Sequence, residues 1–272
     1  MSSSQASVNE IAPNDIHIIR DPVVYLVGRQ TVDQSTIQQF LQDHGATWAT
    51  DTEVGGEHLA EIAGRLCYMS YARPRPGGNK AYLDHILEVG HGSVLEHAAW
   101  NFIFTGISRS CTHELVRHRA GFGFSQLSQR YVDESVAEYV EPDVIANDPE
   151  LHALWLDAIG RVHQAYVVLV QKLNERFSAE PDRTLRRKMA RQAARSVLPN
   201  ATETKIFVTA NARALRHFIE MRASRHAEVE IRKLAIAVLR VMQTEAPNLF
   251  GDYQLVDLGD GTWEATTQYR KV

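Results

Sequence analysis

Apolar and polar positions alternate along the chain with two different periods, which predicts a mixture of strands and helices. From 98 to 107 apolar side chains fall on every second residue, with Trp100, Phe102 and Phe104 on one face, so this segment is predicted to be a strand. Shorter strands are predicted at 22–28 and 205–209. Apolar residues spaced by three and four predict helices at 36–44, 58–68, 82–89, 110–119, 150–177, 183–197, 211–221 and 224–245.

Residues that begin, end or interrupt helices support these boundaries. Ser110 is expected to cap the helix that follows it, Gly90 to end the helix before it, and Pro181 to separate the helices on either side. Proline and glycine predict a loop at 72–78, and the Ser-rich residues 1–14 are expected to form a flexible tail. Because strands and helices do not alternate regularly and both are present, the predicted class is α+β, with a mixed sheet flanked by helices.

The composition places the chain among globular proteins. Of its 272 residues, 44% are hydrophobic and 23% are charged, which argues against a disordered chain. Two cysteines are too few for a disulfide framework or a four-thiolate zinc site. No apolar run reaches the roughly 20 residues that span a bilayer, and residues 1–9 lack the apolar core of a signal peptide. We therefore expect a soluble cytoplasmic protein with no membrane partner.

The basic residues are unusual in kind and in distribution. Arginine supplies 23 of the 29 basic side chains, and although the formal net charge is −4, residues 101–240 carry 21 basic against 16 acidic side chains. Arginine presents a planar set of donors that suits phosphate and carboxylate groups. A GC-rich genome accounts for the excess as readily as a local anion site does. A nucleic-acid coat would carry a basic domain, so no nucleic-acid partner is expected.

The first candidate site lies at 117–130. It begins with Arg-His-Arg at 117–119 and ends with Ser-Gln-Arg at 128–130. Between them, Gly121 and Gly123 give the backbone freedom to approach a ligand. Converging arginines, amides and hydroxyls are typical of a phosphate site. A solvated helix end, where arginine suits the helix dipole, explains the pattern equally well.

A second group of basic residues lies at 211–226. Arg213 and His217 are four residues apart, as are Arg222 and His226, so each pair is expected to share a helical face. Because like charges at this spacing destabilise a helix, the pattern indicates neutral histidines or an anion bound between the pairs.

Metal and nucleophile chemistry have less support. Glu96-His97 lacks the histidine three positions earlier that an inverted zinc motif requires, since Ser93 stands there, so no metal site is predicted. Cys67 lies on an apolar helix face and is expected in the core. Cys111 has basic neighbours that would lower its pKa, but a single cysteine among polar residues is more often incidental.

Four segments together resemble the flavin-dependent thymidylate synthases. The family's signature of Arg-His-Arg, seven or eight residues, Ser, one residue and Arg matches 117–130 with the eight-residue spacing. The family's other segments match His91, Ser93, Glu96 and His97 upstream, and Arg195, Asn211, Arg213, Arg222 and His226 downstream. The resemblance spans about 85–250, in the family's order and spacing. It departs at Glu114, where some members have Gln, and at His217, where some have Asn.

The resemblance implies reductive methylation of dUMP to dTMP with FAD as cofactor, NADPH as its reductant and methylenetetrahydrofolate as carbon donor, without a cysteine nucleophile. It also implies one catalytic domain at 15–272 that assembles as a homotetramer. The implied FAD-binding residues are Ser93, Arg117, His118, Arg119, Gln126, Asn211, Arg213, His217 and His226. The implied dUMP-binding residues are Glu114, Arg117, Gln126, Leu127, Ser128, Gln129, Arg130, Arg195 and Arg222. Arg222 is implied to be catalytic, because it would favour loss of the uracil N3 proton.

Two other functions are compatible with the same residues. One is a nucleotide- or RNA-binding protein without catalysis, which would use the arginines on phosphates and show strongly salt-dependent binding. The other is a flavoenzyme of the same fold that acts on a different pyrimidine.

Overall fold

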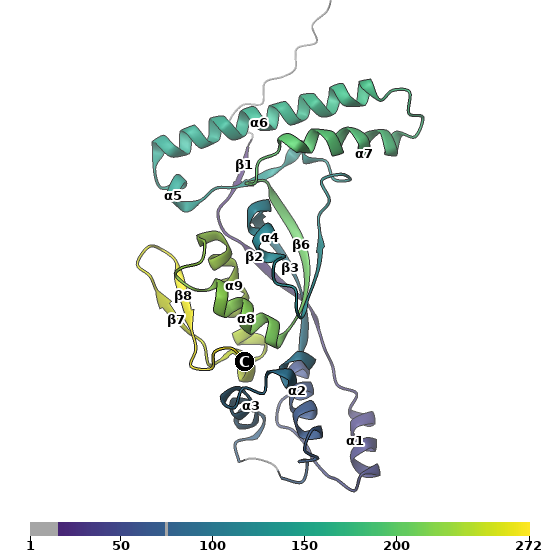
Figure 1. The fold of residues 1–272 in the computed structure, drawn as a ribbon, viewed down its shortest axis with the longest axis vertical. Coiled ribbons are helices and arrows are strands. Elements are labelled where there is room, and N and C mark those ends of the chain that lie inside the picture. The colour runs from purple at the N-terminus through teal and green to yellow at the C-terminus, as the bar shows by residue number, and fades with distance from the viewer. Residues whose placement is uncertain (1–15, 74–75) are drawn as a thin grey trace, which may run out of the picture. The chain divides into compact units, whose positions relative to one another are not determined.

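The alternating segment of the sequence forms strand β3 of a four-stranded main sheet, whose order is β2-β3-β6-β4 (Figure 1). Strands β2 and β3 pair antiparallel. Trp100, Phe102 and Phe104 of β3 are all buried, which confirms the face predicted from the alternation. The strands of this sheet are β2 (Val23–Arg29), β3 (Ala99–Ser108), β4 (Phe122–Gln126) and β6 (Glu203–Asn211).

The chain divides into two units, each built from separate stretches of sequence. The structure, a computed structural model, describes residues 16–73 and 76–272, so the tail predicted at 1–14 and part of the loop predicted at 72–78 lie outside it. The single domain predicted at 15–272 stays a prediction. Unit 1 comprises the residues up to Asp21, Gly106–Thr112 and Gln126–Lys205, and unit 2 comprises Pro22–Thr105, His113–Ser125 and Ile206–Val272.

Unit 2 has its core around helix α9. This helix packs against α8, α10 and strands β2 and β8, and its apolar face, which includes Ile231, Leu234 and Leu239, is buried. Helix α2 packs against α3 and against the short 3₁₀ helix η2. The elements are α1 (Gln34–Asp43), α2 (Gly55–Leu66), α3 (Gly78–Glu88), η2 (Gly92–His97), α8 (Ala212–Arg222), α9 (Val229–Glu245), α10 (Pro247–Phe250) and the antiparallel pair β7 (Gln254–Asp257) and β8 (Trp263–Thr266).

Unit 1 is dominated by helices α6 and α7, which lie side by side (Figure 1). Asp148 and Asp182 cap them, because each carboxylate accepts two backbone N–H groups of the first turn. No helix in the described part of the chain combines the length and apolar character needed to cross a membrane. The elements are β1 (His17–Ile19), which pairs parallel with β5 (Glu138–Val140), together with η3 (Glu134–Val136), α5 (Asp143–Ala146), α6 (Pro149–Arg176), α7 (Arg183–Ala194) and η4 (Arg195–Val197).

Parallel and antiparallel strand pairs with helices packed around them confirm the predicted mixture of strands and flanking helices, but two helix boundaries were wrong. The helix predicted at 110–119 is α4 (Arg109–Leu115), and the hydroxyl of Ser108, in place of Ser110, accepts the N–H of Cys111 at 3.0 Å. The helix predicted at 224–245 begins only at Val229, because the Glu228 carboxylate caps it there.

Two further expectations failed for local reasons. Cys67 was expected in the core but is exposed, because α2 ends at Leu66, which is itself 49% exposed. Strand β4 was missed, because glycines at 121 and 123 were interpreted as a break. Only Gly121 adopts a positive φ, of 72°, while Gly123 lies within the strand.

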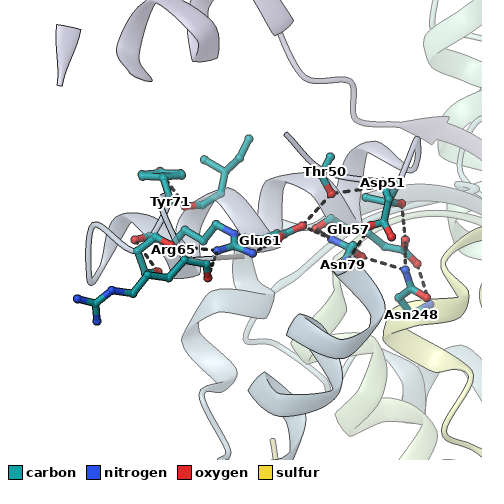
Figure 2. Close-up of polar contacts among 12 residues, drawn as sticks. Thr50, Asp51, Glu57, Glu61, Arg65, Tyr71, Asn79 and Asn248 are labelled. Atoms are coloured by element: carbon teal, nitrogen blue, oxygen red, sulfur yellow. Dashed lines mark hydrogen bonds and ion pairs between the residues drawn. The ribbon is translucent and has the colours of Figure 1, made fainter. Parts of the chain in front are cut away.

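A buried polar network joins α2 to α3 and α10 within unit 2 (Figure 2). The Glu61 carboxylate accepts two bonds from Arg65, at 2.7 and 2.8 Å, and one from Asn79 at 2.7 Å. Glu57 accepts the backbone and side-chain N–H groups of Asn248 at 2.8 and 3.0 Å, and burial raises the pKa of its carboxyl. Since α2 packs against η2, this network supports the segment that carries Ser93.

Candidate functional site

A pocket of about 470 Å³ opens in unit 2 along α8, lined by residues of this helix from its cap Asn211 to Met221. Its volume lies in the range of small-molecule sites. Three residues of the implied FAD site, Asn211, Arg213 and His217, line it. Arg213 and His217 are both exposed on α8, which confirms that this pair shares a helical face.

Asn211 and Gly121 fix the local geometry of the pocket. The Asn211 side chain caps α8 by accepting the N–H of Ala214 at 2.9 Å, and the backbone N–H of Asn211 donates to the Gly121 carbonyl at 3.1 Å. A Cβ at position 121 would lie 2.7 Å from the Ala214 Cβ. Glycine is therefore required at 121 both by its positive φ and by this contact.

Arg213 places a guanidinium in the first turn of α8. Its Nη1 donates to Glu96 of η2 at 2.5 Å, and a Cβ at position 92 would lie 2.8 Å from its Nε, so Gly92 leaves room for it. The first turn of α8 contains no acidic residue. A guanidinium added to the positive end of a helix dipole favours an anion in the pocket.

Arg222, the last residue of α8, contacts two other predicted site residues. Its Nε donates to Nε2 of His118 at 3.0 Å, and its Nη1 donates to Glu114 at 2.8 Å. The imidazole of His118 must therefore be an acceptor at Nε2, with its proton on Nδ1. These two bonds use two of the five N–H donors of Arg222, which leaves others for a ligand.

The surroundings of His118 keep it neutral. Burial, then the charge of Arg222 and the proximity of His217, lowers the pKa of His118 to about 4. Its ring centroid lies 5.9 Å from that of His217, which lines the pocket, and 5.2 Å from that of Phe218. The Arg222–His118–Glu114 cluster is therefore one imidazole ring away from the pocket.

The pKa of His118 gives a direct test of this cluster. We expect His118 to stay unprotonated from pH 9 down to about pH 5 and to take up a proton only below that, since its pKa lies near 4. In the Arg222→Ala variant the pKa should rise but stay below the ordinary 6.5, because burial is the larger cause. NMR titration of the imidazole nitrogens measures both values; an unchanged pKa in the variant would contradict the contact.

The other basic residues predicted in unit 2 lie on its surface. Arg117 is exposed and bonds Nε2 of His113 at 3.1 Å, and Arg119 and Ser93 are exposed as well. The prediction that Arg222 and His226 share a helical face is wrong, because α8 ends at Arg222 and a turn follows. Among the described residues no three His, Cys, Asp or Glu side chains gather as metal ligands would.

The implied dUMP-binding residues at 126–130, together with Arg195, belong to unit 1. The Gln126 amide donates to the hydroxyls of Thr112 and Thr204 at 2.9 and 3.3 Å. The backbone N–H of Leu127 donates to the Lys205 carbonyl at 2.9 Å. Gln129 is buried, and the Ser128 hydroxyl accepts the N–H of Arg130 at 3.4 Å. Within the described residues, Nε of Arg130 is buried without a hydrogen-bond partner, and so are Nε of Arg191, Arg216 and Arg232.

Two charged residues of unit 1 were missed by the sequence reasoning. Arg109 donates to the Leu127 carbonyl at 3.4 Å, and burial lowers its pKa, with Arg195 acting in the same direction. Glu134 is 5% exposed, and burial raises its pKa to about 7 despite the nearby Arg109. Arg109 begins a helix and Glu134 lies in a short acidic run, so neither position carried a signal of burial.

Comparison with known proteins identifies the family. Residues 50–248 match the family model Thy1, described as thymidylate synthase complementing protein. The flavin-dependent thymidylate synthase of Mycobacteroides abscessus is 55% identical over 225 residues, which cover 82% of this chain and 89% of that protein. The protein of that name from Mycobacterium sp. strain JLS is 56% identical, covering 84% and 92%.

A solved structure shares the fold. The UMP/dUMP methylase PolB from Streptomyces cacaoi, crystallised with 5-Br UMP, superimposes with a TM-score of 0.61 at 20% identity, covering 87% of this chain and 95% of that chain. At this identity the likeness concerns the fold alone. The family model and the relatives show the family as well as the fold, because they match most of the sequence. The chain belongs to the family of flavin-dependent thymidylate synthases.

Proposed function

We propose that this chain catalyses the reductive methylation of dUMP to dTMP, with FAD as the bound cofactor, NADPH as its reductant and methylenetetrahydrofolate as the carbon donor. The observation that carries the proposal beyond family membership is the Arg222–His118–Glu114 cluster, one ring away from the pocket that Asn211 and Arg213 line.

The pocket residues fit FAD. Arg213 offers a cation, and the start of α8 and the neighbouring imidazole of His217 offer hydrogen-bond donors. Both kinds of group suit the diphosphate of a dinucleotide. Ser93, Arg117, His118, Arg119, Gln126 and His226 complete the proposed FAD-binding set. When bound and reduced, FAD supplies the hydride, and the chain contributes binding and alignment.

Arg222 is the proposed catalytic residue. A guanidinium keeps its charge at any working pH, so it stabilises negative charge on the uracil ring without titrating itself. Glu114 and neutral His118 hold it from two sides, and its remaining donors are available to the ring. Loss of the N3 proton is favoured in this way, which activates the pyrimidine toward hydride.

The nucleotide is proposed to bind through Glu114, Arg117, Gln126, Leu127, Ser128, Gln129, Arg130, Arg195 and Arg222. The chain is proposed to form a single catalytic domain at 15–272, to act as a cytoplasmic homotetramer, and to build each site from more than one subunit.

Product formation tests this function. With dUMP, methylenetetrahydrofolate, NADPH and FAD the protein should form dTMP, and omission of FAD should abolish the product. Cys111→Ala should form dTMP at a rate close to that of the unsubstituted protein, because Cys111 is 2% exposed and cannot attack a bound pyrimidine from there. An inactive but folded Cys111→Ala variant would instead indicate a cysteine nucleophile, and a protein without dTMP synthesis would refute the proposal.

A further inference from the structure

The last two residues of the segment 267–272 form one wall of the pocket in unit 2. Lys271 and Val272 line the pocket, and Val272 is 9% exposed. A Cβ at position 92 would lie 2.6 Å from the Val272 carbonyl carbon, so Gly92 makes room for this segment as well as for Arg213. The segment lies outside 50–248, the part matched by the family model. This wall therefore uses residues that the family model does not describe.

Hydrogen bonds to α8 hold the segment in place. The Glu220 carboxylate accepts the backbone N–H of Lys271 at 2.9 Å and Nε of Arg270 at 3.1 Å. The Tyr269 carbonyl accepts Nη2 of Arg216 at 3.2 Å, and Arg216 is itself buried and paired with Asp252. Two of these bonds fix the backbone on both sides of residue 270, and the third holds the Arg270 side chain.

Lys271 adopts a conformation that is rare for a residue with a side chain. Its φ of 59° lies in the left-handed region, which costs free energy for residues other than glycine. The surrounding bonds over-determine the backbone and so sustain this conformation. The side chain is held at the rim of the pocket.

The charges around the pocket leave one cation without a protein partner. Arg213 is paired with Glu96, and Glu220 is engaged by Arg270 and by the backbone. No residue in the described ranges forms a hydrogen bond or ion pair with the Lys271 ammonium. The Lys271 ammonium and the Arg213 guanidinium line the same pocket, and such cations have the chemistry of a phosphate ligand.

We propose that Lys271 binds the diphosphate of FAD, and that residues 267–272 are part of the cofactor site. This inference rests on the proposed function, because it takes FAD as the occupant of the pocket. The ammonium contributes a charge-assisted hydrogen bond, while the segment itself screens that side of the pocket from solvent.

Titration of the protein with FAD, followed by quenching of flavin fluorescence, tests the proposal. Lys271→Gln should raise the Kd for FAD about tenfold, the scale of one hydrogen bond to a charged group, and should make the Kd less dependent on salt. Lys271→Arg should keep most of the affinity. Lys80→Gln is the matched control, because Lys80 is an exposed lysine of the same unit, paired with Asp84 and outside the pocket.

The possible results distinguish the proposed function from the proposed role of Lys271. If the unsubstituted protein binds FAD and Lys271→Gln binds it within about twofold, Lys271 is not a ligand and the proposed function stands. Equal losses in Lys271→Gln and Lys271→Arg would mean that shape, in place of charge, matters at this position, which also overturns the proposal. If the unsubstituted protein takes up no FAD, the proposed function fails and this inference fails with it.

Discussion

Arg222→Ala is expected to lower kcat for dTMP formation by about 100- to 1,000-fold, the usual loss when a donor that stabilises developing charge is removed. The variant loses the guanidinium that joins Glu114 and His118, so the uracil ring would meet a neutral imidazole and an unpaired carboxylate. Initial rates at saturating dUMP measure the effect. FAD binding should change much less than kcat, because Arg222 is not among the residues that line the pocket.

Arg225→Ala is the matched control for this prediction. Arg225 lies three residues further along the chain and is exposed. It pairs with Glu264, which is not one of the proposed site residues. Exposed pairs of this kind contribute little to stability, so turnover should be close to that of the unsubstituted protein. Unchanged dTMP synthesis by Arg222→Ala would refute the catalytic role.

Glu61→Ala is expected to have the largest effect on stability, about 3–5 kcal/mol in the free energy of unfolding. Glu61 and Arg65 are 1% and 2% exposed, and the substitution leaves the guanidinium buried without its carboxylate (Figure 2). The Asn79 amide and the Thr50 hydroxyl lose an acceptor as well. Thermal unfolding should show Tm lowered by roughly 10 °C.

Asp84→Ala controls for the loss of an ion pair as such. Asp84 pairs with Lys80 at the same four-residue spacing on α3, but both side chains are exposed. Asp84→Ala should therefore change the free energy of unfolding by no more than about 0.5 kcal/mol. The double variant Glu61→Leu/Arg65→Met should lose less stability than Glu61→Ala, because it leaves no buried charge without a partner. If Glu61→Ala and Asp84→Ala destabilise the protein equally, the buried pair has no special role.

Local patterns predicted much of the secondary structure. One face of β3 is buried at every second residue, and the Asn211 side chain caps α8 within one turn. Both features depend on short segments, so both could be predicted from the sequence. Strand β4 could not, because Gly121 just before it and Gly123 within it carry no side chain to mark a face. The start of α9 was missed because Glu228 caps it with a carboxylate that looked like an ordinary helical residue.

Three of the predicted site residues are close in sequence and lie together in the structure, whereas the contacts of Arg222 could not be predicted. Asn211, Arg213 and His217 lie within seven residues, and the structure gathers them in one pocket. The bonds of Arg222 to Glu114 and His118 join positions more than 100 residues apart, and no local pattern encodes such a contact. Lys271 gave no signal in the sequence, because its place in the pocket depends on Gly92 and Glu220.

The most direct test of the central claim is the flavin absorption spectrum during a single turnover. The purified protein, loaded with FAD and reduced anaerobically by NADPH, should regain the spectrum of oxidised flavin only when dUMP and methylenetetrahydrofolate are both added, with dTMP formed in equal amount. A protein that takes up no FAD, or whose reduced flavin is not reoxidised by the two substrates together, would contradict the account.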